Sequence, residues 1–335
     1  MTITDVAKKA GVSKATVSRY LNQSGYVGED TKRRIEAVIE NCRYMPMAAA
    51  RNLSKRESDT IGVLIPEITN PYFAIAFEGI GEMADQNGLD VFFYNTAQDP
   101  AREEKALYSL KKQGAKGVII APSVDFDNRE STRRFELLIQ EIGLPMVFMD
   151  VSIDLDLGDG VFVDNQWAAY RAVEAMIERG YHNIGFLGTR RIKSIKDRFR
   201  GYCRALEAHG LSVQERFLVD AEVGTMEPSY VASKTFLEKG DLPEAMFTSN
   251  TFTSMGFLKA AFELGLVLEK DISCMAFDRL DFIEMFDLKY NYLERAPKSM
   301  GRSAVQLLLD RIEKPDMPVT RQLIPYRVVM YQNNS

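Results

Sequence analysis

The sequence contains few of the side chains that metal-binding, disulfide or nucleophilic chemistry needs. Its 335 residues include three cysteines and two histidines. Cys42, Cys203 and Cys274 are far apart and odd in number, which argues against a disulfide framework or a zinc site and favours a reducing compartment. His182 and His209 belong to no nucleophile motif, and neither an HExxH nor a Walker A pattern occurs. We therefore expect a protein that is not an enzyme and that holds no metal or cofactor.

Long hydrophobic runs are also missing. No apolar stretch approaches the roughly 18 residues that a bilayer span requires. The first ten residues, MTITDVAKKA, have no apolar segment after their charges, unlike a secretory signal peptide. A cytoplasmic protein that does not contact a membrane is the expectation.

The formal net charge of −5 conceals an uneven distribution of charge. Residues 1–60 contain eleven lysines and arginines against seven acids, a net charge of +4, so the remaining 275 residues carry −9. A basic head on an acidic body predicts that the head alone binds a polyanion.

The basic head has the signals of three short helices. Thr2 and Asp5 are typical of a helix start, and Gly11 of its end. Ser13 is placed to cap a second helix, and a third opens after Gly28 with two acids in its first turn. Apolar residues at helical spacing can close one small core: Val6, Ala10, Val17, Leu21, Ile35, Val38, Ile39 and Cys42.

A helix, a glycine turn and a second capped helix are the parts of a helix-turn-helix, whose second helix lies in the major groove of DNA. Basic side chains there can donate to guanine, and alanine can contact a thymine methyl group. Short polar side chains suit phosphate oxygens. The alternative is a basic solvated face on an ordinary helical bundle. The predicted DNA-facing residues are Lys14, Ala15, Ser18 and Arg19, with Thr4, Ser13, Thr16 and Asn22 as predicted phosphate contacts.

From Thr60 onward, apolar strands alternate with amphipathic helices. This pattern is typical of parallel sheets covered on both faces, and about ten such units favour two sheets rather than one. Expected helices are 71–86, 102–113, 166–179 and 197–209. Expected strands are 61–66, 90–94, 117–121, 145–149, 160–163, 183–188, 245–249 and 272–278, and residues 323–331 are strand-like.

Two stretches of the head, ITDVAKKAGVSKATVSRYLN and TKRRIEAVIENCRYMP, resemble the DNA-binding domain of the lactose-repressor (LacI/GalR) family of bacterial transcription regulators. The stretch IGVLIPEITNPYFAIAFEGIGEMADQNG resembles the start of the effector-binding domain of that family. The similarity runs from about residue 2 to about residue 325. It implies a homodimeric repressor that binds a pseudo-palindromic operator. No leucine heptad follows LIPYRVVMY, so a dimer is expected rather than a tetramer.

The resemblance also implies a division into domains. Residues 1–45 would form the helix-turn-helix domain, 46–59 a hinge helix and linker, and 60–335 an effector-binding body. The body would be a periplasmic-binding-protein fold of two doubly wound parallel-sheet subdomains. Their expected ranges are 60–160 plus 293–320, and 161–292 plus 321–335.

The resemblance implies that Pro46–Ser54 forms a hinge helix. In members of the family, one leucine from this helix of each subunit inserts into the minor groove of DNA. Leu53 occupies that position, and an apolar wedge of this kind unstacks and kinks the duplex. Met47 stands where many relatives have asparagine.

Ligands of such folds bind beyond the carboxyl ends of the strands, between the subdomains. The resemblance places effector-binding residues at this position, although each could instead serve as a strand-end cap, an ion-pair partner or a core residue. Met226 stands where relatives often carry an aromatic residue, and Arg295 where many have a glutamine. The expected effector-binding residues are Tyr72, Phe73, Asp150, Ser194, Arg198, Met226, Asn250, Asp278 and Arg295.

The charge around this cleft predicts an anionic effector, a sugar acid or a sugar phosphate. The segment TRRIKSIKDR holds five cations and one acid. Guanidinium groups there favour a planar carboxylate or a phosphate. No glycine-rich phosphate loop follows the first strand, which favours a hexuronate-derived keto acid. The alternative is that these cations are solvated, or pair with Asp150 and Glu294. The cations are Arg190, Arg191, Lys193, Lys196 and Arg198, with Arg295 from a later segment.

The resulting hypothesis is a repressor of carbohydrate or sugar-acid catabolism genes whose operator affinity depends on a small effector. A periplasmic-type sugar-binding transport protein is the alternative, although the basic head and the missing signal peptide disfavour it. An enzyme with a ribokinase-like or dehydrogenase body lacks any catalytic constellation.

Overall fold

We describe the fold from a computed structural model of the chain, which describes residues 2–22, 24–42, 58–151, 157–281, 288 and 290–331. The chain forms two compact units, Met1–Ser58 and Asp59–Ser335, and each is described by itself. Leu53 and the rest of the expected hinge helix lie outside the described residues.

The first unit contains three helices: α1 (Ile3–Ala10), α2 (Lys14–Asn22) and α3 (Glu29–Cys42). Both predicted caps are confirmed. Thr2 and Asp5 form a reciprocal capping box, and Gly11 ends α1 with a φ of 66°. The Ser13 hydroxyl accepts a hydrogen bond from the Thr16 amide at 3.1 Å, which caps α2. The helices meet in a small core around Val6, Val17 and Ile35.

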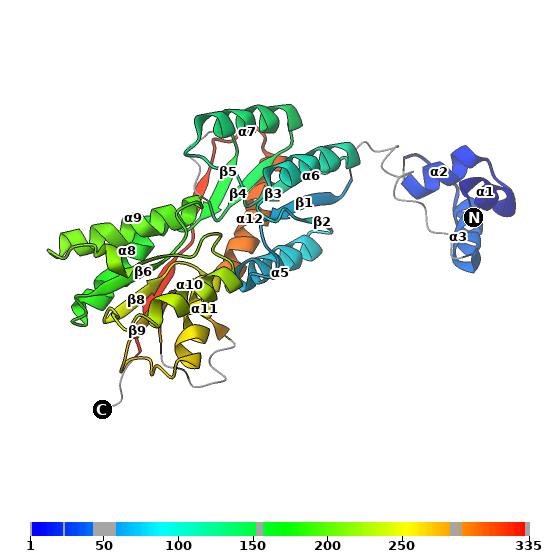
Figure 1. Cartoon of the computed structure of the whole chain (residues 1–335). Helices are drawn as coiled ribbons and strands as arrows, with labels where there is room; N and C mark the ends of the chain where they lie inside the picture. The colour runs from blue at the N-terminus through cyan, green and yellow to red at the C-terminus, as the bar shows by residue number, and fades with distance from the viewer. Residues whose placement is uncertain are drawn as a thin grey trace. The chain divides into compact units, whose positions relative to one another are not determined.

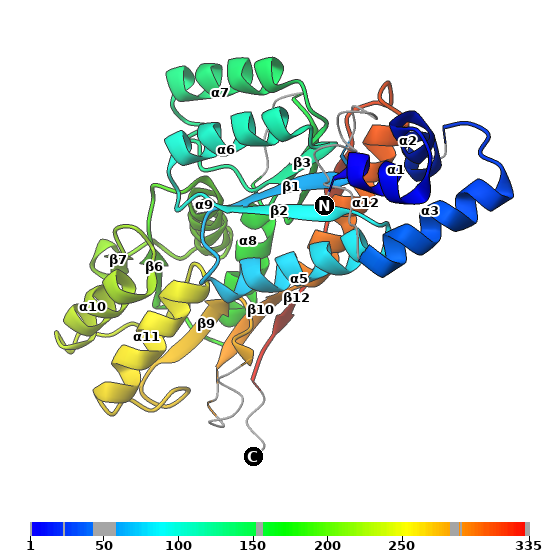
Figure 2. The same cartoon turned by 90° about the vertical axis from the view of Figure 1, so that its right-hand side faces the viewer.

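The second unit contains two six-stranded sheets (Figures 1 and 2). The strand order is β11-β5-β4-β3-β1-β2 in the first sheet and β12-β10-β9-β8-β6-β7 in the second. All described pairings are parallel except that of β12 with β10. The first sheet comprises β1 (Thr60–Ile65), β2 (Asp90–Asn95), β3 (Gly117–Ile120), β4 (Met146–Met149), β5 (Asp159–Phe162) and β11 (Arg321–Leu323). The second comprises β6 (Ile184–Gly188), β7 (Leu218–Asp220), β8 (Ala245–Thr248), β9 (Ser273–Phe277), β10 (Asn291–Arg295) and β12 (Tyr326–Val329).

Each sheet is covered on both faces by helices. In the first subdomain, α6 and α7 pack on one face and α5 and α12 on the other (Figure 2). In the second, α10 and α11 pack on one face and α8 and α9 on the other. None of the described helices is long and apolar enough to cross a membrane. The helices are α5 (Pro71–Gln86), α6 (Pro100–Gln113), α7 (Arg129–Ile142), α8 (Asn165–Glu178), α9 (Lys193–Ala208), α10 (Met226–Leu237), α11 (Thr251–Glu263) and α12 (Pro297–Glu313), with a 3-10 turn η1 (Glu215–Phe217).

The eight strands predicted from apolar runs are all present, whereas β7, β10 and β11 were missed. These three are short or carry charged residues, so they lack a continuous apolar run. The helix expected from residue 197 begins four residues earlier, at Lys193. The ion pair between Lys193 and Asp197, 3.0 Å apart on adjacent turns, stabilises this extra turn.

The chain passes between the sheets after β5, after β10, and between β11 and β12. Residues 293–295, expected in the first subdomain, therefore lie in the second sheet, and residues 321–323 lie in the first sheet. The reason is strand pairing: β10 lies between β9 and β12, and β11 extends the edge of the first sheet beside β5.

The close packing of α5 against α12 generates a prediction about stability. A Cβ atom on Gly79 would lie 2.1 Å from the Lys298 carbonyl oxygen, whereas one on Gly81 of the same helix would meet nothing within 4 Å. Gly79→Ala should lower the free energy of unfolding of the body by about 1–3 kcal/mol through overpacking. Gly81→Ala should raise it by ~0.5–1 kcal/mol through the lower entropy of the unfolded chain. Urea denaturation checks both variants, and equal effects would contradict the packing argument.

Candidate effector cleft and DNA-recognition helix

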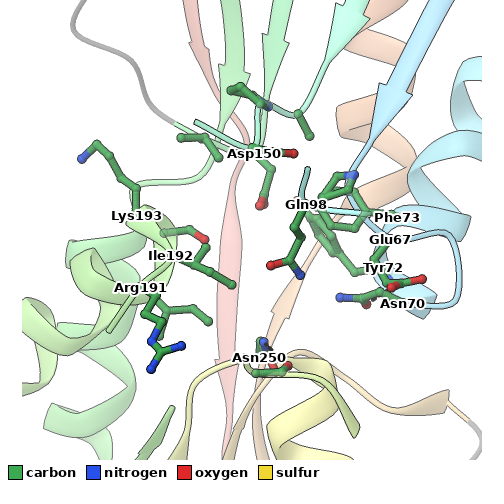
Figure 3. A pocket seen from close by; sticks show the side chains of 18 of the residues that line it. Glu67, Asn70, Tyr72, Phe73, Gln98, Asp150, Arg191, Ile192, Lys193 and Asn250 are labelled. Atoms are coloured by element: carbon green, nitrogen blue, oxygen red, sulfur yellow. Dashed lines mark hydrogen bonds between the residues drawn. The ribbon is translucent and has the colours of Figure 1, made fainter. Parts of the chain in front are cut away.

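A cavity of about 250 Å³ lies between the two subdomains, beyond the carboxyl ends of their strands. Its walls come from both sides (Figure 3). Glu67, Tyr72 and Gln98 lie on the first-subdomain side, and Arg191 and Lys193 lie opposite them. This is the position at which open parallel sheets bind ligands.

The structure brings eight of the nine expected effector-binding residues to this cavity. Met226 is the exception: it begins α10 and is not among the lining residues, whereas Gly224, two positions earlier, is. The expectation that Met226 replaces a stacking aromatic residue at the ligand is therefore not supported by the geometry. The eight residues are Tyr72, Phe73, Asp150, Ser194, Arg198, Asn250, Asp278 and Arg295.

Several polar lining residues were not identified from the sequence. They follow β1, β2 and β3 in the first subdomain, where the ends of parallel strands gather polar side chains. That position was the available signal, because each lies in a short loop after an expected strand. They are Glu67, Asn70, Gln98, Ser123 and Asp125.

Arg295 is the best-paired charge of the site. Its Nε and Nη2 donate to the two carboxylate oxygens of Asp278 at 2.7 and 2.9 Å, and its Nη1 donates to Asp150 at 2.9 Å. The guanidinium also lies 3.6 Å from the ring centroid of Tyr72. Burial lowers the pKa of Arg295, but the charges of Asp278 and Asp150 outweigh burial and hold the pKa above its usual range.

This pairing corrects part of the sequence interpretation. Arg295 was expected to receive an anionic effector, but two carboxylates of the chain already hold it. The alternative of pairing with Asp150 is present, whereas Glu294 pairs with Arg279 and Arg327 instead. Alternation along β10 places Glu294 and Arg295 on opposite faces of the sheet, which explains the difference.

The two carboxylates that hold Arg295 both have unusual backbones. The φ angles of Asp150 and Asp278 are 66° and 118°, a region that non-glycine residues rarely adopt. Each such residue costs on the order of 1–3 kcal/mol and persists where the surroundings hold it. The ion pairs with Arg295 supply that restraint.

Arg198, by contrast, contacts no carboxylate among the described residues. Its Nε donates to the Asn165 side-chain oxygen at 2.8 Å, and its Nη1 donates to the Ser249 carbonyl at 2.7 Å. The guanidinium lies 3.7 Å from the ring centroid of Phe277. Burial, reinforced by the charge of Arg295, lowers the pKa of Arg198 to about 10, although the charges of Asp150 and Asp278 act in the opposite direction. Arg198 therefore brings a buried positive charge to the cavity wall.

The first turn of α9 lies beside Arg198 and lines the same cavity. Ile192, the N-cap, makes no side-chain capping hydrogen bond. The first amide groups of a helix lack partners within it and carry the positive end of the helix dipole. Ser194 is a buried residue that lines the cavity, and its hydroxyl makes no hydrogen bond to another described residue. These groups together form an array of donors without an acceptor.

The remaining cations of the TRRIKSIKDR segment are divided between the rim and the cavity. Lys193 pairs with Asp197 and Lys196 with Asp125 and Asp127, so neither charge is left uncompensated. Arg190 lies 5.6 Å from the ring centroid of Phe199. Arg191 is exposed, lines the cavity and has no ion pair with a described residue.

On the first unit, the expected base-reading residues Lys14, Ala15 and Arg19 are exposed on α2, and Ser18 is half-buried. Thr4 and Ser13 are exposed, and Thr16 is half-buried. The Ser13 and Thr16 hydroxyls lie 2.8 Å apart and hydrogen bond to one another. Their first role is therefore to cap α2, which leaves less capacity for phosphate contacts. The side chain of Asn22 lies outside what the structure describes.

The three-helix unit and the two-subdomain body define a DNA-binding regulator with an effector cleft, and comparison with known proteins agrees. Residues 2–47 match the family of bacterial regulatory proteins of the lacI type. Residues 58–332 match the family of periplasmic binding proteins and sugar-binding domains of LacI proteins. The chain belongs to the LacI family and is a DNA-binding transcriptional regulator of that type.

Similar proteins are regulators as well. The chain is 28% identical over 313 residues to the HTH-type transcriptional repressor PurR of Photobacterium profundum, covering 93% of this chain and 92% of that protein. A putative ribose operon repressor from Burkholderia thailandensis is 25% identical, with a TM-score of 0.70, over 82% of this chain and 100% of the other. The lac repressor dimer bound to operator and the anti-inducer ONPF shares the fold with a TM-score of 0.85 at 23% identity, over 99% and 98% of the two chains.

The pairing of Arg295 leads to a prediction about folding. Arg295→Gln would leave Asp150 and Asp278 buried with an unpaired negative charge, which costs about 3–5 kcal/mol. We expect the free energy of unfolding of the body to fall by that amount in urea denaturation. Arg327→Gln, which removes an exposed partner of Glu294, is the control and should change stability little. A stable Arg295→Gln protein would show that the cluster does not hold the body together.

Proposed function

We propose that this regulator is a repressor whose operator affinity is set by a small anionic, hydroxylated effector, a sugar acid, bound in the cleft. The observation that carries the proposal is the buried charge of Arg198 beside the uncapped start of α9. We further propose residues 1–45 as the DNA-binding domain, 46–59 as the hinge and 60–335 as the body, acting in the cytoplasm. Leu53 remains the proposed minor-groove wedge.

We infer an anionic effector from the cations of the cleft that make no direct ion pair with the protein. Arg198 makes no direct contact with a carboxylate, and Asp150 and Asp278, whose charges act on it from a distance, are already bound by Arg295. A buried cation without a bound counter-ion is costly, and a ligand anion would lower that cost. A carboxylate can accept from the Arg198 guanidinium, the Ser194 hydroxyl and the first amides of α9 together. Arg191, exposed on the same wall, adds positive charge at the entrance.

The wall on the first-subdomain side of the cavity presents acceptors for hydroxyl groups. We therefore propose that the rest of the ligand is hydroxylated. One carboxylate oxygen of Glu67 accepts hydrogen bonds from the Thr69 amide and hydroxyl, at 3.3 and 2.7 Å. Its other oxygen has no hydrogen-bond partner among the described residues, and Gln98 lines the same wall. Acceptors of this kind suit the hydroxyl groups of a sugar acid. We therefore favour a hexuronate-derived keto acid over a small unsubstituted carboxylate.

A purine base is the alternative effector that the repressors named PurR suggest. Stacking would be the main interaction for a base, but one face of the Tyr72 ring is covered by the Arg295 guanidinium. Met226 lies outside the cavity lining and supplies no stacking surface. The transport-protein alternative is disfavoured because the head matches the regulatory family.

We test the proposed effector with two variants, Ser194→Ala and Arg198→Gln, which change residues proposed to bind its anionic group. We expect 2-keto-3-deoxygluconate to bind the full chain more tightly than glucose or hypoxanthine in calorimetric titration. Ser194→Ala, which removes no hydrogen bond within the described protein, should weaken that binding by up to about tenfold. Arg198→Gln should weaken it by about 10- to 100-fold, since hydrogen bonds to charged groups contribute more.

The same titrations can also contradict the proposed anionic effector. Glucose or hypoxanthine bound tightly by the wild type, and equally by both variants, would sink the anionic proposal. A thermal melt of each variant in the absence of ligand separates lost binding from lost folding, and Ser194→Ala should melt like the wild type.

For the recognition helix, Arg19→Ala should cost about 1–3 kcal/mol of operator binding and relax the preference at one base pair. The side chain is exposed on α2, so the loss should come from DNA contact rather than from folding. Binding to a library of operator variants measures both effects, with Arg133→Ala on the body as the control. An equal loss on every sequence would mean that Arg19 contacts phosphate alone.

We also propose a homodimer formed through the edge of the first sheet. The edge strand β2 exposes Phe92 and Phe93, by 39% and 36%, and Phe93 packs against Phe77 of α5. Exposed aromatic residues on an edge strand are unfavourable in a monomer.

Phe93→Glu should place a charge in this face and yield monomers in sedimentation velocity. Tyr108→Glu, at a site of similar exposure (39%) on α6, should stay dimeric. A dimeric Phe93→Glu protein would exclude this face as the subunit contact.

A further inference from the structure

One cation of the TRRIKSIKDR segment connects the two subdomains. Lys196 lies on α9 of the second subdomain, and its ammonium contacts Asp127 at 2.5 Å and Asp125 at 3.5 Å. Both acids lie in the loop that follows β3 of the first subdomain. Asp125 also lines the cavity, so these contacts close one side of its rim.

The acidic loop is held firmly by its own subdomain. The Ser123 amide donates to the buried Glu103 of α6 at 2.8 Å, and the Ser123 hydroxyl lies 3.1 Å from that of Thr96. At its other end, Asn128 caps α7. A force on Asp125 or Asp127 would therefore act on the first subdomain as a whole, whereas a force on Lys196 would act on α9 of the second subdomain.

This contact differs in kind from the ion pair between Arg295 and Asp150, which also joins the subdomains. Arg295 and Asp150 are buried, and Arg295 ends the strand after which the chain returns to the first sheet. The side chains of Lys196, Asp125 and Asp127 are 21%, 53% and 46% exposed. Exposed pairs are weakened by salt and contribute little each, so they can open while the buried pair remains.

We propose that Lys196, Asp125 and Asp127 form a clasp that holds the cleft closed in the absence of a ligand. The clasp sets the equilibrium between the closed and the open body. A group that stabilises one of two conformations changes the affinity of every ligand that distinguishes them. Under the proposed function, the clasp therefore adjusts the response to effector without contacting it.

The clasp is charged throughout the neutral range. The hydrogen bond from Lys196 lowers the pKa of Asp127, and the hydrogen bond to Asp127 raises the pKa of Lys196. The other charged groups near Asp127 are Lys193 and Arg200 of α9, which act in the same direction. Salt, rather than a pH change near 7, is accordingly the condition that loosens it.

Hydrogen exchange of the full-length chain tests the clasp without any effector. Lys196→Gln should increase amide exchange in residues 123–128 by about two- to fivefold, the range expected for one exposed ion pair. The buried strands should exchange as in the wild type. Arg204→Gln is the matched control: it removes an exposed cation from the same helix that is not among the charged groups acting on Asp127.

Two further measurements distinguish a clasp from a general loss of charge. Exchanging the charges, with Lys196→Asp and Asp127→Lys together, should restore slow exchange. Raising the salt concentration from about 0.05 to about 0.5 M should speed exchange of this loop in the wild type but not in Lys196→Gln.

Unchanged exchange in Lys196→Gln, or an equal increase in Arg204→Gln, would overturn the proposal. The regulatory consequence rests on the proposed function, whereas the exchange measurement does not. If exchange follows the expected pattern but 2-keto-3-deoxygluconate does not bind, the clasp stands and the effector proposal fails.

Discussion

The body depends on one buried cation, Arg295, and the two carboxylates that surround it. Asp150 ends a strand of the first sheet, while Asp278 and Arg295 end strands of the second. The guanidinium joins these strand ends with three hydrogen bonds and holds two aspartates in an unfavourable backbone conformation. Tyr72, from the first helix of the body, packs on the same guanidinium. The floor of the cleft is thereby an ion-pair cluster that spans both subdomains.

The cations near this cluster are of two kinds: those neutralised by acids of the protein, and those that remain available to a ligand. Arg295 is neutralised within the protein, and so are Lys193 and Lys196. Arg198 is buried nearby with only neutral acceptors, next to the open start of α9. The same segment therefore supplies a helix-stabilising pair, a link between the subdomains and the wall proposed to bind an anion. The distinction depends on which acid each cation reaches.

Local patterns explain why much of the fold could be predicted. The caps of α1 and α2 involve residues three apart, and the eight predicted strands are short apolar runs, so neighbouring residues determine both. The strands β7, β10 and β11 could not be found this way. The β10 segment NYLER has no apolar run, and its strand structure depends on pairing with β9 and β12 from distant parts of the chain.

The features of the cleft also fall into two groups, those that the sequence indicates and those that depend on tertiary structure. From the sequence by itself, the helix-turn-helix, the alternation of strand and helix and the acidic body could be inferred. Eight of the nine residues that the family resemblance implies for the effector site do line the cavity. Only the tertiary structure decided that Arg295 is paired and Arg198 is not, and that Met226 lies outside the cavity. Arg295 and Asp150 are 145 residues apart in the chain, and Lys196 and Asp127 are 69 apart. Which charges neutralise one another depends on how the two subdomains approach each other. No local sequence pattern encodes contacts between residues so far apart in the chain.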